Sequence, residues 1–158
     1  MRTKKAPQRN IQPDPIYNSR LVAKVISGCM HDGKKSLASK HVYQAIKIIE
    51  EKTKQEGLEY LQQAVENIKP QMEVRSRRVG GASYQVPTNI RPERKQSLAV
   101  RWIIAAARAR SNSEFHTFAE KLAAEVMEAY QNQGSAAKKK IDTHKMAEAN
   151  KAFSHLRW

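Results

Sequence analysis

Apolar residues recur at three- and four-residue spacing through most of the chain, which is the period of an amphipathic helix. A first helix is predicted after Asn18 or Ser19, either of which can cap it. Its apolar side carries Leu21, Val22, Val25, Ile26, Cys29 and Met30. A second helix, capped by Ser36, carries Ala38, Val42, Ala45, Ile46 and Ile49. A third follows Gly57, ends at Pro70, and carries Leu58, Leu61, Val65 and Ile68.

Residues 72–88 break this helical period. Alternating and β-branched residues flank Gly80-Gly81 on both sides. Both central positions of a tight hairpin turn require a positive φ, which glycine adopts without steric cost. The pattern therefore predicts a β-hairpin, which must lean on the helices or on a ligand because an isolated hairpin is marginal in water.

Helical spacing then resumes for three more segments. Pro92 suits a first helical position and opens a helix to about residue 110. Ser113 is the predicted cap of a fifth helix, which Gly134 closes, and its apolar residues are Phe115, Phe118, Leu122, Val126 and Tyr130. A sixth, from about 135, carries Met146, Ala149 and Phe153.

The predicted fold is mainly α. The first 17 residues hold three prolines and read as an extended basic N-terminal arm. Residues 18–158 are predicted to form a single domain of about six helices, with the hairpin at about 72–88 between helices three and four. A chain of 158 residues is long enough to bury the core of one such domain.

Charge points to the partner. The chain has 29 Lys and Arg against 15 Asp and Glu, a net charge of +14, which favours a polyanion, either nucleic acid or an acidic membrane surface. Two near-neutral or acidic segments, 41–70 and 111–130, alternate with three basic ones, 1–40, 71–110 and 131–158. This alternation indicates that the former pack and the latter contact the partner.

Other classes of protein lack support. No apolar run is long enough to span a membrane as a helix, and the N-terminus lacks the apolar stretch of a secretory signal. We predict no membrane partner. A single cysteine excludes an internal disulfide and indicates a reducing compartment. Residues 28–35 approach a phosphate-binding loop, but position 35 is Lys where a magnesium-binding hydroxyl is needed. No histidines pair at metal-ligand spacing, so we predict no enzyme, no metal and no cofactor.

The helix from Pro92 presents a basic arc. At 100° per residue its cations span about 140° opposite the apolar face. They are Arg91, Arg94, Lys95, Arg101 and Arg108. Leu98 and Trp102 fall inside this arc, and a tryptophan there can pack on ribose or a base. The alternative is that Trp102 packs against the hairpin and the arginines are solvated.

The hairpin carries the sharper signal, because Arg75, Arg77 and Arg78 lie within four residues and Tyr84 opposes them. Arginine forks match phosphate oxygens bidentately, and tyrosine adds a stacking surface. Positive charge also protects edge strands from aggregation, which is the alternative reading. Weaker candidates for RNA contact, which solvated chain ends would equally explain, are Arg2, Lys4, Lys5, Arg9, Lys34, Lys35, Lys138 and Lys139.

Several motifs together resemble one family. Residues 77–81 (RRVGG) and 84–87 (YQVP), with Asp14-Pro15, residues 32–36 (DGKKS), 99–103 (AVRWI) and the closing 144–158, resemble bacterial-type small-subunit ribosomal protein S-seven. The resemblance implies a helical domain whose hairpin binds the 3′ major domain of small-subunit ribosomal RNA and nucleates assembly of the subunit head. It also implies a place near the messenger RNA exit path and the exit-site transfer RNA.

The same resemblance implies the partners and the residues that bind them. Members contact protein S-eleven and other head proteins, and work in the cytoplasmic ribosome, with an organellar ribosome the less favoured setting. The ribosomal RNA contacts that the resemblance carries over are Lys34, Lys35, Arg75, Arg77, Arg78, Arg94, Lys95 and Arg101. From the residues alone, a helical DNA-binding factor is the alternative, and it would need a short recognition helix after a tight turn.

Overall fold

The structure is a computed structural model that describes residues 10–156. Six α-helices, one 3₁₀ helix and one β-hairpin are assigned within those residues, which confirms the predicted mainly α class. In chain order they are α1 (Arg20–Cys29), α2 (Lys35–Thr53), α3 (Gly57–Ile68), β1 (Met72–Val79), β2 (Ala82–Asn89), α4 (Pro92–Ala109), α5 (Phe118–Tyr130), α6 (Gly134–Ala149) and η1 (Lys151–Leu156).

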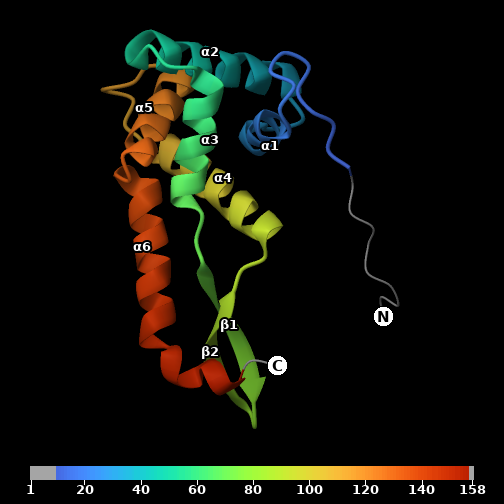
Figure 1. Cartoon of the computed structure of the whole chain (residues 1–158), viewed down its shortest axis with the longest axis vertical. Coiled ribbons are helices and arrows are strands. Elements are labelled where there is room, and N and C mark those ends of the chain that lie inside the picture. The colour runs from blue at the N-terminus through green and yellow to red at the C-terminus, as the bar shows by residue number, and fades with distance from the viewer. Residues whose placement is uncertain (1–9, 157–158) are drawn as a thin grey trace.

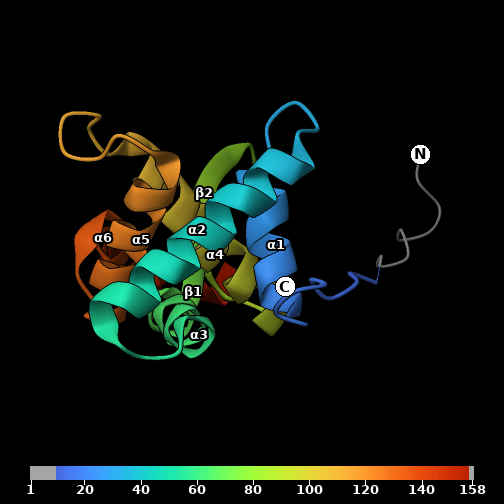
Figure 2. The ribbon, with the colours of Figure 1, turned by 90° about the horizontal axis from the view of Figure 1, so that it is seen from above.

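The helices form a body from which the hairpin projects. Seen from above, α2 crosses the body with α1 to one side of it and α5 and α6 to the other (Figure 2). The apolar sides predicted from the three- and four-residue spacing meet at the centre, where Val22, Val42, Ala64 and Ala107 are almost fully buried. One cluster of buried apolar side chains joins α1 to α6.

The hairpin and α6 extend together from this body. The strands of the hairpin run away from the helices, α6 runs beside them, and η1 folds back across them (Figure 1). The strands pair antiparallel from Met72 with Asn89 to Val79 with Ala82. At the turn Gly80 and Gly81 have φ of +57° and +90°, the conformation that the Gly-Gly pair predicts.

Three predicted helix ends are wrong. Ser36 lies inside α2, whose N-terminal cap position is Lys34. The cap of α5 is Thr117 and not Ser113, because Thr117 and Glu120 form a reciprocal capping box that Ser113 has no glutamate to complete. Gly134 begins α6 and does not close α5.

Some predicted faces also differ. Leu98, placed in the basic arc of α4, is 7% exposed and belongs to the interior. The reason is that α4 contacts α1, α3, α5 and α6, so burial extends around more of its circumference than one face. Met30 and Met146, assigned to apolar faces, are exposed, because Met30 follows the last residue of α1 and Met146 lies on the outer side of α6.

Candidate nucleic-acid interface

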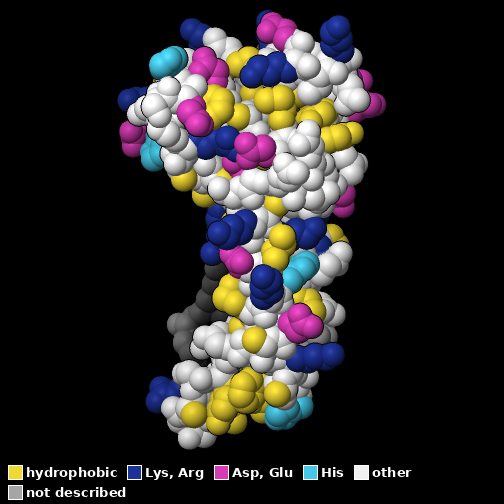
Figure 3. Space-filling model, turned by 90° about the vertical axis from the view of Figure 1, so that its left-hand side faces the viewer, with side chains coloured by type: hydrophobic (Ala, Val, Ile, Leu, Met, Phe, Trp, Pro, Cys, Tyr) yellow, Lys and Arg dark blue, Asp and Glu magenta, His cyan; other side chains and the backbone are white. Residues whose placement is uncertain are grey.

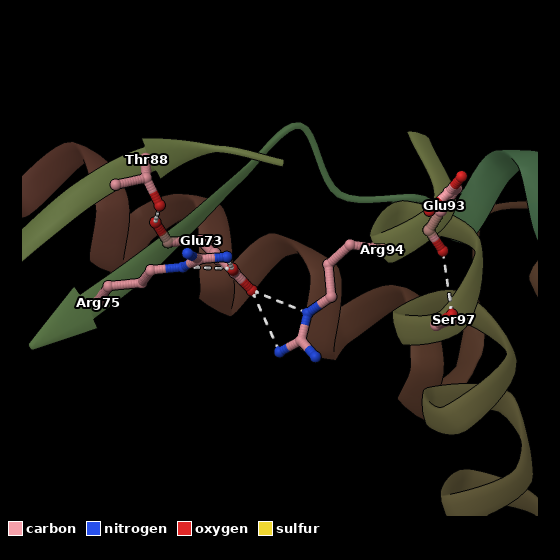
Figure 4. Close-up of polar contacts among 6 residues, drawn as sticks. All are labelled: Glu73, Arg75, Thr88, Glu93, Arg94 and Ser97. Atoms are coloured by element: carbon pink, nitrogen blue, oxygen red, sulfur yellow. Dashed lines mark hydrogen bonds and ion pairs between the residues drawn. The ribbon is translucent and has the colours of Figure 1, made fainter. Parts of the chain in front are cut away.

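Glu73 joins the hairpin to the start of α4. Its side chain is 12% exposed and accepts hydrogen bonds from Arg75 Nε and Nη2 at 2.8 and 2.5 Å. Its other carboxylate oxygen lies 3.5 Å from the Arg94 guanidinium (Figure 4). Two of the arginines predicted to bind RNA are therefore brought to one carboxylate, although they are 19 residues apart in sequence.

A second bond reinforces this junction. Lys95 Nζ donates to Gln71 Oε1 at 2.7 Å, so the first turn of α4 is tied to the residue that precedes β1. We call the cations that line this junction and the hairpin the hairpin–α4 surface. It consists of Arg75, Arg77, Arg78, Arg94 and Lys95.

Near the hairpin tip the predicted residues stand on paired positions. Arg77 pairs with Tyr84 in the register and Arg78 with Ser83. Arg78 is exposed and Arg77 is partly buried. The Tyr84 ring lies 5.3 Å from that of Phe153 in η1, so Tyr84 serves at least in part to hold η1 on the strands.

The remaining cations of α4 are arranged along its length. Arg91 and Arg101 are exposed, and Arg108 donates from Nη2 to the carbonyl of Cys29 at 3.2 Å. Trp102 is partly buried against the helical core and not a free ring. Trp102 therefore packs at least in part on the helical core.

The weaker candidates fall on separate elements. Lys34 and Lys35 are exposed at the turn between α1 and α2, and Lys138 and Lys139 are exposed on α6. Lys140, beside them, instead donates to the carbonyl of Asn67 at 2.5 Å. Arg2, Lys4, Lys5 and Arg9 of the predicted arm lie outside the described residues.

Asp14 has an anchoring role that the sequence analysis did not identify. It is 4% exposed, and its carboxylate accepts from the backbone N–H groups of Ile16 and Tyr17 at 3.1 Å and from the Tyr43 hydroxyl at 2.7 Å. Burial, and then the hydrogen bond to Asp14, raise the pKa of Tyr43 to about 12. Asp14 thereby fastens the segment before α1 to α2, and the only signal for it was an aspartate in a proline-containing turn.

A buried ion network, also missed, orients the start of α6. Glu125 is fully buried and accepts from Arg110 Nε at 2.9 Å and Nη2 at 2.6 Å, and from the backbone N–H of Ala136 at 3.0 Å. Arg110 also pairs with Glu128. Since α6 runs beside the hairpin, this network helps to set where the hairpin points.

Other kinds of site are not supported by the geometry. Within residues 10–156 no three His, Cys, Asp or Glu side chains are placed to hold a metal ion. In the same part of the chain no helix is both long and apolar enough to cross a bilayer. The pKa of the lone Cys29 thiol is raised to about 12, first by burial, which is the opposite of an activated nucleophile.

The fold and this surface together define a class: a basic helical protein with a projecting arginine-bearing hairpin. The family model described as "Ribosomal protein S7p/S5e" matches residues 1–151. The chain belongs to this family of ribosomal proteins, whose members are not enzymes.

Individual relatives match along their whole length. A protein named "Small ribosomal subunit protein uS7" from Nitratiruptor is 56% identical over the full length of both chains. One of the same name from Carboxydothermus hydrogenoformans is 58% identical over 96% of each chain, and one from Thermotoga maritima is 56% identical over the full length of both. The DNA-binding alternative loses its basis, because the described residues place the cations on strands and helices together and the relatives are ribosomal.

Proposed function

We propose that this chain, a structural protein of the small ribosomal subunit, binds ribosomal RNA through the hairpin–α4 surface. The observation that carries the proposal is the junction at Glu73, where arginines from β1 and α4 meet at one carboxylate. The two elements thereby bring cations that are distant in sequence to one place. Such an arrangement can engage phosphates of an irregular RNA fold at several points, which a single recognition helix does not.

Charge and side-chain type support RNA phosphate as the ligand. Most cations of the hairpin–α4 surface are arginines, which bind phosphate oxygens with two parallel N–H donors. Glu73 pre-orients Arg75 and Arg94 in the free protein, so less side-chain freedom is lost on binding. The carboxylate must give up part of these contacts when a phosphate arrives.

The finer assignment follows the family resemblance. The proposed target is the 3′ major domain of small-subunit ribosomal RNA, where the chain nucleates assembly of the subunit head. The hairpin and the C-terminal segment would then lie near the messenger RNA exit path and the exit-site transfer RNA. Protein S-eleven and other head proteins are the proposed neighbours, and the cytoplasmic ribosome is the proposed setting.

The experiment that tests this function compares two RNAs. Binding of the full chain to a 3′-major-domain fragment and to an unrelated RNA of equal length is measured across a salt series. Non-specific phosphate binding falls steeply as salt rises, whereas specific contacts leave a residual preference. We expect a preference of at least ~100-fold for the ribosomal fragment at high salt. Equal affinities at every salt concentration would refute specific binding.

A further inference from the structure

A polar groove runs along the outer side of α3, away from the residues of the hairpin–α4 surface. It has a volume of about 1030 Å³ and reaches the turn between α5 and α6. Its lining residues are Gln55, Glu56, Glu59, Tyr60, Gln62, Gln63, Glu66, Asn67, Tyr130 and Asn132. None of these is a lysine or an arginine, on a chain whose net charge is +14.

The acidic side chains of the groove are available for a partner. Glu66 pairs with Lys69, but within residues 10–156 neither Glu56 nor Glu59 makes a side-chain hydrogen bond or an ion pair. Both are exposed. A glutamate pair without a cation is unfavourable for phosphate and favourable for lysine or arginine.

The floor of the groove is rigid. The rings of Tyr60 and Tyr130 stack with centroids 4.0 Å apart and planes within 12° of parallel. Asn67 donates to the carbonyl of Tyr130 at 2.7 Å, which ties α3 to the end of α5. A preformed floor lowers the ordering cost of binding. Tyr60 is 6% exposed, so the aromatic surface that an arginine side chain could contact is that of the half-buried Tyr130.

We propose that this groove binds a basic, extended segment of another protein. The glutamates would pair with lysine or arginine side chains, and the surrounding amide side chains, such as Gln62, can both donate to and accept from a peptide backbone. The groove and the hairpin–α4 surface therefore fit ligands of opposite charge. The chain would join RNA on one surface to a basic protein on the other.

A peptide titration tests the charge complementarity. The probe is a fluorescein-labelled ten-residue peptide of alternating arginine and glycine, followed by anisotropy. The variant Glu56→Gln with Glu59→Gln removes the unpaired carboxylates. The control, Glu114→Gln with Glu148→Gln, changes the net charge equally at exposed positions outside the groove. We expect about tenfold weaker binding for the groove variant and no change for the control.

Two outcomes of the titration would overturn the proposal. Equal weakening of both variants would mean attraction to overall charge alone. A wild-type Kd above about 1 mM would mean that the groove does not hold a basic segment. Affinity for the 3′-major-domain RNA fragment is measured on the same variants and is expected to be unchanged, so failure here is distinguishable from failure of the RNA-binding proposal.

Crosslinking in assembled subunits identifies what occupies the groove. Gln62→Cys, carrying a benzophenone maleimide, is incorporated into small subunits reconstituted with the full chain. The natural Cys29 is buried, with its pKa raised to about 12, so the label goes to position 62. We expect a crosslink to a lysine- and arginine-rich segment of a ribosomal protein. A crosslink to RNA or to a segment without excess positive charge, or no crosslink at all, would refute the proposal.

Discussion

Arg77 and Arg78 carry the sharpest test at the scale of single residues. Changing both to alanine should weaken binding to the 3′-major-domain fragment by at least ~10-fold, because each guanidinium can form a bidentate phosphate contact. The matched control, Lys138→Ala with Lys139→Ala, removes the same charge from α6 and should cost less than ~3-fold. Filter binding at one salt concentration measures both, and equal losses would contradict a special role for the hairpin.

Replacing Glu125 should strongly destabilise the folded protein. Glu125→Ala leaves Arg110 without its principal buried partner and the Ala136 N–H without an acceptor. We expect a loss of about 3–5 kcal/mol in the free energy of unfolding, measured with urea. Glu114→Ala, at an exposed position, should change it by less than about 0.5 kcal/mol. A loss below 1 kcal/mol for Glu125→Ala would show that the network is not stabilising.

His144 should make stability depend on pH. Its Nε2 accepts from the Gln71 backbone N–H at 3.0 Å, which requires an unprotonated Nε2. Burial, and then the charge of Lys140, lower its pKa below the ordinary 6.5. As the pH falls, the unfolded chain therefore takes up the proton first, and stability declines from about pH 6.5 downwards until the folded pKa is passed.

The comparison with His144→Gln isolates this effect, since the other four histidines are the same in both proteins. Urea unfolding at pH 7.5 and at pH 5.5 gives, for each protein, the loss of unfolding free energy between the two pH values. We expect the larger loss in the wild type, because glutamine keeps an acceptor but does not titrate. The same loss in both proteins would assign the pH dependence elsewhere.

Individual residues were only partly predictable from the sequence. The hairpin arginines lie close together in the sequence, so their spacing alone makes them candidates for RNA contact. The roles of Glu73 and Asp14 could not be predicted in this way, because each acts through a partner that is distant in the chain. The partner is Arg94 for Glu73 and Tyr43 for Asp14. Tertiary packing brings these partners together, and it produces no periodic pattern in the sequence that could be read in advance.

The start of α5 offers a test at the scale of the element. Thr117→Ala removes the oxygen that accepts from the Glu120 N–H, so we expect a loss of about 1 kcal/mol in unfolding free energy. Ser113→Ala, at the cap position that the sequence pattern favoured, should be nearly neutral because Ser113 precedes the helix. Thermal or urea unfolding of the two variants decides between the caps. A larger loss of stability for Ser113→Ala than for Thr117→Ala would identify Ser113 as the cap.

Elements were more predictable than their ends. Each of the six α-helices within residues 10–156 overlaps a predicted helix, since burial of one face leaves a period of 3.6 in the sequence. In α6 the predicted face is wrong, because Met146 and Ala149 are exposed and the buried side carries Ala136, Ala137 and Ala147. The caps were less certain because several serines and threonines stand within reach of each helix start, and only the bonds formed in the fold choose among them. The Gly-Gly turn was readable because its positive φ values restrict the residue type.

At the scale of the whole molecule the body and the hairpin should differ in local stability. Within the described residues the main apolar cluster joins helices α1 to α6 and takes no side chain from either strand. Amide hydrogens of β1 and β2 should therefore exchange faster than those of α5, because local opening there disrupts fewer buried contacts. Hydrogen–deuterium exchange with peptide resolution measures this. Protection of the strands equal to that of α5 would contradict it.

The arrangement of the body and the hairpin was not predictable as a whole. Charge alternation did not separate the packing segments from the basic ones, because α1 and α4 lie in basic segments and yet supply Val22, Ile26 and Ile104 to the core. Figure 3 shows acidic side chains over the helical body and apolar side chains gathered at the far end. That α6 accompanies the hairpin depends on long-range contacts such as Lys140 with Asn67. Such contacts join residues 73 positions apart and follow only from the assembled core.

The packing of α6 and η1 against the hairpin affects how accurately the hairpin tip is positioned. Eight-residue strands reach ~26 Å, so a tilt of only ~10° at the base would swing the tip by ~4–5 Å. A hydrogen bond tolerates displacements of only about 0.5 Å. A small tilt at the base is therefore amplified at the tip. His144 of α6 bonds the residue before β1 and Phe153 of η1 packs on Tyr84 of β2, so these two hold the hairpin. Lys140 instead ties α6 to α3. Accuracy at the tip is set by residues that need never touch the ligand.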